Sequence, residues 1–273
     1  MSNSIDKAFV GPLPAVYAEH LVPLIFESCA VDLVDRLAAR QRPITRLLEI
    51  AAGTGVVTRE MASRLPASVE IVATDLNPGM LEQATAMGTS RPCDWQRADA
   101  MQLPFPDESF DAVVCQFGVM FFPDKPKAFA EARRVLKPGG VFIFSVWDRT
   151  ETNEFADVVT KSLADVFPAD PPRFLPRTPY GYNDPATIAK DIAAGGFTSA
   201  PAFDTFTARS RAESPTIPAI AYCQGTPLRS EIEARDPGGL HSATKTAGEA
   251  IAKQFGHGAV DGQIQAIVVT VEK

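Results

Sequence analysis

The chain has 273 residues, of which 45% are hydrophobic and 22% charged, a composition typical of a globular protein with a sizeable core rather than of a disordered chain. Its formal net charge of −7 opposes a broad surface for nucleic acid, because such a surface must attract phosphate groups. The four cysteines form no CxxC pair, and neither a signal peptide nor an apolar run of about 18 residues is visible. We therefore expect a cytoplasmic protein with reduced thiols, no membrane span and no nucleic-acid partner.

The first forty residues show an apolar stripe with helical spacing, and Pro23 is expected to bend or restart that helix. From Thr45 onwards, short apolar runs alternate with amphipathic helical patterns. The predicted strands are 47–51, 69–74, 110–116 and 141–147, and the predicted helices are 57–65, 80–87 and 127–136. Strands that are apolar along their whole length indicate a parallel sheet covered by helices on both faces. The sequence Leu136–Gly140 is expected to be a turn after the last of these helices.

The second half is less regular. The pattern predicts a helix over 155–167, a proline-rich loop over 168–179, a short helix over 185–194, a strand over 203–208, a mostly helical region over 215–255 and a closing strand over 264–271. We find no internal repeat. The fold class that follows is α/β, with a doubly wound sheet in one domain.

A glycine-bearing turn follows the first predicted strand, in the sequence Glu49-Ile-Ala-Ala-Gly-Thr-Gly55. Glycines permit a positive φ and let a ligand approach the backbone closely. In open α/β sheets, nucleotides bind at this carboxyl end of the strands. A tight turn without a ligand is the alternative, because short glycine motifs are weak signals.

Asp75 ends the second predicted strand, 20 residues after Gly55. A carboxylate at this place can accept hydrogen bonds from both hydroxyls of a ribose. The alternative is a helix cap ahead of Asn77-Pro78. The spacing between the glycines and the carboxylate makes the pair more specific than either part.

Two details separate a dinucleotide site from other nucleotide sites. The dinucleotide fingerprint requires a third glycine three residues after the second, and this position is Thr58. Glu49 would repel a pyrophosphate and attract a ligand that carries an ammonium and a sulfonium.

Together these motifs resemble those of class I S-adenosylmethionine-dependent methyltransferases, in the group that includes ubiquinone and menaquinone biosynthesis methyltransferases. The resemblance extends over about Arg46–Trp147. Besides Glu49–Gly55 and Asp75-Leu76, it includes Ala98-Asp99-Ala100 with Leu103-Pro104-Phe105, Phe110–Val113 with Gln116-Phe117, and Leu136–Gly140. Ala51 departs from the family pattern, in which glycine is commonest.

The resemblance implies a Rossmann-like methyltransferase fold with a seven-stranded, mostly parallel sheet in the order 3-2-1-4-5-7-6 and with helical cap insertions. It implies one domain over 1–273 with a donor-binding core at about 45–148. Two segments, about 149–182 and 211–258, exceed what the sheet needs and carry aromatic side chains, so we expect cap segments that choose the acceptor. The alternative is that these helices only pack on the core or form a dimer contact. The resemblance also implies S-adenosylmethionine as the cofactor, S-adenosylhomocysteine as the product and a small-molecule acceptor. The donor-binding residues that it predicts are Tyr17, Glu49, Ala51, Gly53, Gly55, Asp75, Leu76, Met80, Asp99, Ala100 and Gln116.

Methyl transfer from a sulfonium is an in-line displacement that depends mainly on positioning and on excluding water. The sequence accordingly shows no convincing catalytic residue. His241 falls on a polar helix face, His257 in a glycine-rich turn and His20 near Tyr17, so each is a weak candidate for a base. No group of residues has metal-ligand spacing, and we predict no metal site.

Other readings remain open at the level of sequence. An NAD(P)-dependent oxidoreductase and a non-catalytic nucleotide-binding protein share the fold, and a nucleic-acid methyltransferase would need an aromatic motif that Gln116–Val119 lacks. A homodimer is possible. The acceptor itself cannot be inferred, because fold does not fix function.

Overall fold

The computed structural model describes residues 13–273, so any helical structure expected before Leu13 lies outside the described residues. The strands are β1 (Arg46–Ile50), β2 (Glu70–Asp75), β3 (Asp94–Arg97), β4 (Phe110–Gln116), β5 (Leu136–Trp147), β6 (Ala202–Ala212) and β7 (Val260–Glu272). The helices are α1 (Leu13–Val16), η2 (Tyr17–Phe26), α2 (Glu27–Ala38), α3 (Val56–Arg64), α4 (Pro78–Met87), η3 (Val119–Phe121), α5 (Lys125–Val135), η4 (Thr150–Thr152), α6 (Glu154–Val166), α7 (Phe174–Arg177), α8 (Pro185–Ala194), α9 (Thr216–Gln224), α10 (Leu228–Arg235) and α11 (Leu240–Phe255).

The seven strands form one sheet in the order β3-β2-β1-β4-β5-β7-β6, which confirms the predicted fold class and strand order. Strands β1 to β5 pair in parallel. Near one end of β5, the N–H of Gly139 donates to the carbonyl of Lys273, and the N–H of Lys273 donates to the carbonyl of Gly140. Near the other end, the N–H of Asp148 donates to the carbonyl of Gln265. Residue numbers therefore fall along β7 as they rise along β5, so β7 runs antiparallel to its neighbour.

Contacts divide the chain into two compact units. The first, called the helical unit here, is the described part of Met1–Glu27 with Trp147–Gly181 and Thr207–Ala266. The second, called the sheet unit, is Ser28–Val146 with Tyr182–Phe206 and Ile267–Lys273. Strands β6 and β7 each contribute residues to both units.

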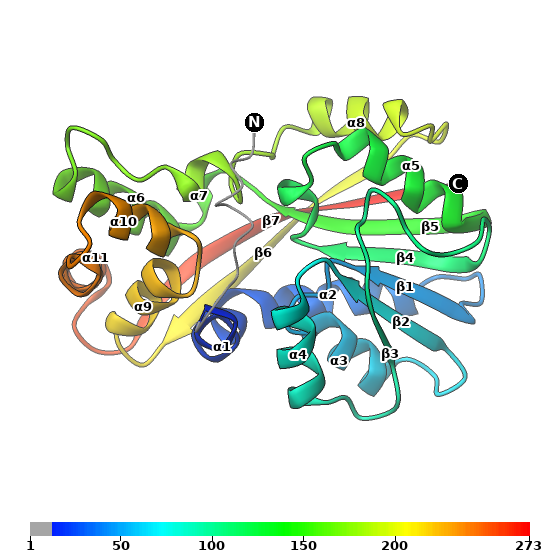
Figure 1. Ribbon diagram of the computed structural model, residues 1–273, viewed down its shortest axis with the longest axis horizontal. Helices are drawn as coiled ribbons and strands as arrows, with labels where there is room; N and C mark the ends of the chain where they lie inside the picture. The colour runs from blue at the N-terminus through cyan, green and yellow to red at the C-terminus, as the bar shows by residue number, and fades with distance from the viewer. Residues whose placement is uncertain (1–12) are drawn as a thin grey trace. The chain divides into compact units, whose positions relative to one another are not determined.

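In the sheet unit, helices cover both faces of the parallel strands, as the apolar runs predicted (Figure 1). One face, with Leu47 and Ile143 among its residues, packs with α2 and α3 in a core that includes Leu33 and Met61. The other face carries Phe142 and Phe144, whose rings lie against Phe129 of α5 at 5.9 and 5.4 Å between centroids. Phe197, just after α8, stacks on Phe142.

Several helices of the sheet unit begin with the same local device. The side chains of Asn77, Asp124 and Asp184 accept hydrogen bonds from backbone N–H groups in the first turns of α4, α5 and α8, and a proline follows each of them within two residues. Such a cap satisfies donors that have no partner inside the helix, and proline costs nothing at these positions.

The structure differs most from the sequence-based expectation at two strands, and β6 and β7 are longer than the predicted strands 203–208 and 264–271. Leu136–Gly140, expected as a turn, belongs to β5, because Leu136 pairs with Phe110 and Gly139 donates to the carbonyl of Lys273. The sequence predicts no strand at the short edge strand β3. Its residues Asp-Trp-Gln-Arg have no apolar pattern and are half-buried or exposed. It forms because β2 offers it a parallel edge with the pairing Val72–Asp94.

The helical unit consists mostly of helices that pack through large apolar side chains. The rings of Phe155 on α6 and Phe255 on α11 meet edge to face at 5.0 Å. Pro23 lies within the π-helix η2, and regular α-helix begins at Glu27, so the predicted irregularity near this proline is confirmed. Within residues 13–273, no helix is both long and apolar enough to span a membrane. The four cysteines are free, and Cys29, Cys115 and Cys223 are buried as expected.

Candidate functional site: a nucleotide site at the carboxyl ends of β1, β2 and β4

The loop after β1 has an unusual backbone. Ala51, Gly53 and Gly55 all have positive φ, at +56°, +58° and +81°. Glycine adopts this conformation readily, and for alanine it is uncommon. The strain at Ala51 is typical of a loop whose shape serves a ligand.

The two glycines of this loop have different surroundings. A Cβ on Gly55 would lie 2.6 Å from the ring of Trp95 and 3.3 Å from Ala84, so Gly55 is needed for packing against β3 and α4. A Cβ on Gly53 would meet nothing within 4 Å. Open space beside a positive-φ glycine is what a ligand that approaches the backbone requires.

Asp75, at the end of β2, is tied to this loop. Its Oδ2 accepts from the N–H of Gly53 at 2.8 Å, and its Oδ1 accepts from the N–H of Asn77 at 2.8 Å. Partial burial raises the pKa of Asp75, and these backbone donors lower it. The N-cap of α4 is Asn77 and not Asp75, so the carboxylate is not simply the cap of that helix.

Glu49 is buried on β1, with 1% of its surface exposed. Burial raises its pKa to about 8, the hydrogen bond from Thr58 lowers it, and the charge of Asp75 raises it. Thr58 Oγ1 donates to Glu49 Oε2 at 2.5 Å. The residue in place of the third glycine is therefore a buried partner of the acidic residue, a link that sequence reasoning missed.

The segment after β3 supplies the next predicted residues. Asp99 accepts from the N–H of Met101 at 2.8 Å, and both Asp99 and Ala100 are half-buried. Met80 is buried on α4, whereas Leu76 is 50% exposed. A leucine this exposed beside Asp75 is apolar surface that an adenine ring could cover.

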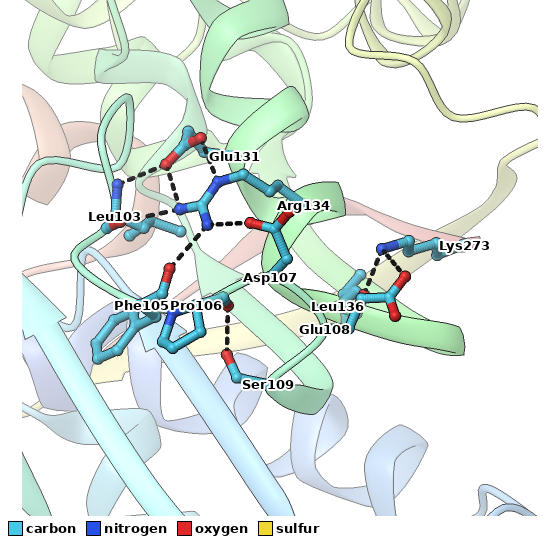
Figure 2. A network of polar contacts seen from close by, with 10 residues as sticks. All are labelled: Leu103, Phe105, Pro106, Asp107, Glu108, Ser109, Glu131, Arg134, Leu136 and Lys273. Carbon is cyan, nitrogen blue, oxygen red and sulfur yellow. Dashed lines mark hydrogen bonds and ion pairs between the residues drawn. The ribbon is translucent and has the colours of Figure 1, made fainter.

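A charged network that the sequence did not reveal braces this segment (Figure 2). Glu131 on α5 accepts from the N–H of Leu103 at 2.7 Å, and the guanidinium of Arg134 donates to the carbonyls of Leu103 and Phe105 at 2.9 and 2.7 Å. Arg134 also pairs with Glu131 and Asp107 at 2.7 and 2.8 Å. Arg134 lowers the pKa of Glu131. In the sequence, this network is marked only by the spacing of Glu131 and Arg134, which are three residues apart on one helix face.

Gln116 ends β4 and is 9% exposed. Its Cα pairs with Ser145 of β5, and the next residue, Phe117, has a φ of +55°. The sheet unit therefore brings Glu49, Gly53 and Asp75 together at neighbouring strand ends and places Gln116 on the adjacent strand.

The remaining candidates lie in the helical unit. Tyr17 is half-buried and packs on Phe26 at 5.2 Å between centroids, and its role as a donor contact stays a prediction. His241 and His257 are exposed, and Lys245 pairs with Glu249 beside His241, which confirms the polar face. His20 is half-buried, and its Nε2 lies 3.8 Å from Oε1 of Glu19. From Leu13 onwards, no three His, Cys, Asp or Glu side chains are grouped so that they could hold a metal ion.

These residues fit S-adenosylmethionine. The open side of Gly53 leaves room at the backbone, Asp75 has lone pairs beyond its two backbone bonds, and Leu76 offers uncovered apolar surface. Glu49 lies next to this loop with a carboxyl that can become an anion. An ionised Glu49 would oppose a pyrophosphate and favour the donor's ammonium.

Comparison with known proteins agrees with this geometry. Residues 48–144 match the family model described as a methyltransferase domain. The chain is 33% identical over 163 residues to the demethylmenaquinone methyltransferase of Deinococcus radiodurans, covering 56% of this chain and 67% of the relative. It is 32% identical over 179 residues to the corresponding enzyme of Thermus thermophilus, covering 62% of this chain and 79% of the relative.

Among solved structures, a putative methyltransferase from Bacillus halodurans superposes with a TM-score of 0.55 at 19% identity, covering 90% of this chain and 99% of that one. This likeness supports the fold. The family model, the two relatives and the donor-site geometry lead to one conclusion: the chain belongs to the class I S-adenosylmethionine-dependent methyltransferases of the ubiquinone and menaquinone group, and it is an enzyme that methylates a small molecule.

Proposed function

We propose that this methyltransferase adds a methyl group to a ring carbon of a reduced quinone that lacks it. The observation that carries the proposal is the match to two demethylmenaquinone methyltransferases over at least two thirds of their length. Relatives described as ubiquinone/menaquinone biosynthesis C-methyltransferases match over shorter segments, such as 41% identity over 115 residues of the Bordetella avium protein. The word C-methyltransferase in these names favours a carbon acceptor.

The donor site in this proposal is formed by residues of the sheet unit. Asp75 binds the ribose hydroxyls, Leu76 and Met80 contact the adenine, Asp99 and Ala100 recognise its edge, and Gln116 contacts the methionine part. Glu49 attracts the donor's ammonium, and Ala51, Gly53 and Gly55 shape the loop around it. A contact of Tyr17 with the donor's methionine carboxylate stays a prediction of the family resemblance alone.

When bound, S-adenosylmethionine supplies an electrophilic methyl group on a sulfonium. The chain's own contribution is positional, because an in-line displacement needs a short and aligned approach of the acceptor in a site without water. No residue is assigned as a catalytic base.

The helical unit contains a run of buried aromatic side chains. Phe26, Trp147 and Tyr180 follow one another at ring distances of 5.9 and 6.0 Å. The hydroxyls of Tyr180 and Tyr222 lie 3.5 Å apart and are buried. We propose that 149–182 and 211–258 form a cap that selects the acceptor, since ligand sites are mostly apolar with few polar groups.

The test combines donor binding and turnover. Calorimetry should show S-adenosylhomocysteine binding at micromolar to sub-millimolar strength and no binding of NAD. Incubation with S-adenosylmethionine and a short-chain demethylmenaquinol should give a product that is heavier by one methylene, as seen by mass spectrometry. Binding of NAD alone would contradict the donor site, and donor binding without quinol methylation would contradict only the acceptor.

Two further expectations belong to the proposal. The net charge of −7 disfavours nucleic acid as an acceptor, so duplex DNA and transfer RNA should remain unmethylated in the same assay. A homodimer also remains a prediction, which light scattering of the purified protein checks.

A further inference from the structure

Ser145 is a polar residue in the apolar interior of β5. It is 2% exposed, and its neighbours along the strand, Phe144 and Val146, are fully buried. Its Oγ is buried and has no hydrogen-bond partner among residues 13–273. Buried hydroxyls are nearly always paired, because an unsatisfied one pays a desolvation cost without return.

The position of Ser145 relative to the donor site follows from the sheet. Donor contacts are proposed at the carboxyl ends of β3, β2, β1 and β4, which are neighbours in that order. Strand β5 is next in line, and the Cα of Ser145 pairs with that of Gln116. Partners in a parallel pair point to the same face, so the side chains of Ser145 and Gln116 leave neighbouring strands, about 4.8 Å apart, on one face of the sheet.

Direction along the sheet decides which ligand the hydroxyl meets. From Asp99 through Asp75 to Gln116, the proposed contacts run from the adenine end of the donor to its methionine end. A group one strand further lies beyond the methionine part, where the acceptor must approach the methyl group. A ring oxygen of a quinol is a partner that a serine hydroxyl can bind.

We propose that Ser145 is an acceptor-binding residue whose hydroxyl, beside the Gln116 carboxamide, hydrogen-bonds one ring oxygen of the acceptor. This inference rests on the proposed quinol acceptor. It assigns to β5 a role in orienting the acceptor, and it explains why a hydroxyl is present in a stretch of otherwise apolar side chains.

The experiment compares Ser145→Ala and Ser145→Cys with the unaltered enzyme. Cysteine keeps nearly the volume of serine but is a weak donor. With short-chain demethylmenaquinol as the probe, both variants should raise the KM for the acceptor by about tenfold, the scale of one neutral hydrogen bond. The dissociation constant of S-adenosylhomocysteine should stay within about twofold.

Thermal melting without ligands gives an independent readout. Removing an unsatisfied hydroxyl should leave the melting temperature of Ser145→Ala unchanged or higher. The matched control is Ser210→Ala, because Ser210 is equally buried on a strand but donates to the carbonyl of Leu24 at 2.8 Å. This control should melt at a lower temperature and keep its KM.

Three outcomes overturn the inference: an unchanged KM for the acceptor, a loss of donor affinity equal to the loss for the acceptor, or a Ser145→Ala variant that melts well below the unaltered enzyme. If the unaltered enzyme does not methylate the quinol at all, the proposed function fails first and the inference falls with it. The two failures are distinguishable, because a failure of the proposed function appears in the unaltered enzyme, whereas a failure of the inference appears only in the variants.

Discussion

The sheet unit and the helical unit carry different kinds of information. In the sheet unit, a few short motifs at strand ends predict the donor site, and the family model matches only 48–144. In the helical unit, the side chains with functional interest are large, aromatic and buried, and no short motif marks them. The contrast teaches that a site built from backbone groups and carboxylates leaves a recognisable motif in the sequence. A site built from the shape of an apolar pocket leaves none.

Four experiments can break or sharpen this comparison. The largest effect is expected at Gly53. A valine there would place its side chain in the open space beside the loop, at a φ of +58° that side chains rarely adopt. The protein should fold, and S-adenosylhomocysteine binding should become undetectable in calorimetry. Unaltered binding would show that the loop does not contact the donor.

Gly55 provides the control for that experiment. Alanine at Gly55 would bring its Cβ within 2.6 Å of Trp95, so the effect should appear in stability, at about 1–3 kcal/mol of unfolding free energy. Chemical denaturation measures it. Gly55 belongs to the same proposed loop, and both glycines have positive φ, so the expected difference is that only Gly55→Ala adds a steric clash with Trp95.

Asp75→Ala should have the next largest effect. Loss of charge-assisted hydrogen bonds to the ribose should weaken donor binding by ~2–3 kcal/mol, or roughly 30- to 150-fold. Because Asp75 also holds the N–H of Gly53, a modest fall in melting temperature is expected as well. Asp75→Asn keeps a hydrogen-bond acceptor without the charge, so its donor affinity should lie between those of the unaltered enzyme and Asp75→Ala. Equal donor affinity in the alanine variant would reduce Asp75 to a structural role.

The aromatic residues of the helical unit should give an intermediate effect on a different quantity. Phe174, Tyr180 and Tyr222 are at most 3% exposed, so alanine would cost folding stability as well as contacts. Tyr180→Phe and Tyr222→Phe keep the rings and remove one hydroxyl each. Either change should lower kcat/KM for the acceptor by up to about tenfold with unchanged donor affinity. Normal acceptor kinetics in both variants and in Phe174→Leu would place the acceptor pocket elsewhere.

The smallest effect concerns the titration of Glu49. Its pKa of about 8 exceeds the ordinary value of 4.5, so between these values the folded state binds more protons than the unfolded state. Stability of the ligand-free protein should therefore fall as pH rises through this window. Glu49→Gln should remove that part of the slope, as melting curves at about pH 6 and pH 8 would show.

Donor binding should change the protonation of Glu49 and so gives a second test of this residue. An ammonium favours the ionised carboxylate, so binding should release a proton at pH 7. Calorimetry in buffers of different ionisation enthalpy measures this release, which should vanish in Glu49→Gln. Proton release that persists in the variant would assign it to another group.

Much of the fold was predictable because its signals are local. Apolar runs identified β1, β2 and β4, and β4 agrees residue for residue with its prediction. The helix over Pro185–Ala194 was also placed correctly, since proline and an aspartate cap mark its start. The edge strand β3 was missed, because an edge strand needs no apolar pattern and exists only beside its partner.

For the site, the sequence by itself determined the donor and predicted the loop that binds it, since glycines and carboxylates at fixed spacing act through the backbone they share. Only the tertiary structure decided which glycine packs and which stays open, that Thr58 is the partner of Glu49, and that Arg134 braces the segment after Asp99. The hydroxyl of Ser145 also became visible only there. These contacts join residues from 9 positions apart, as in Glu49 and Thr58, to 40 positions apart, as in Gly55 and Trp95. No periodicity in the sequence encodes which side chains the folded chain brings together.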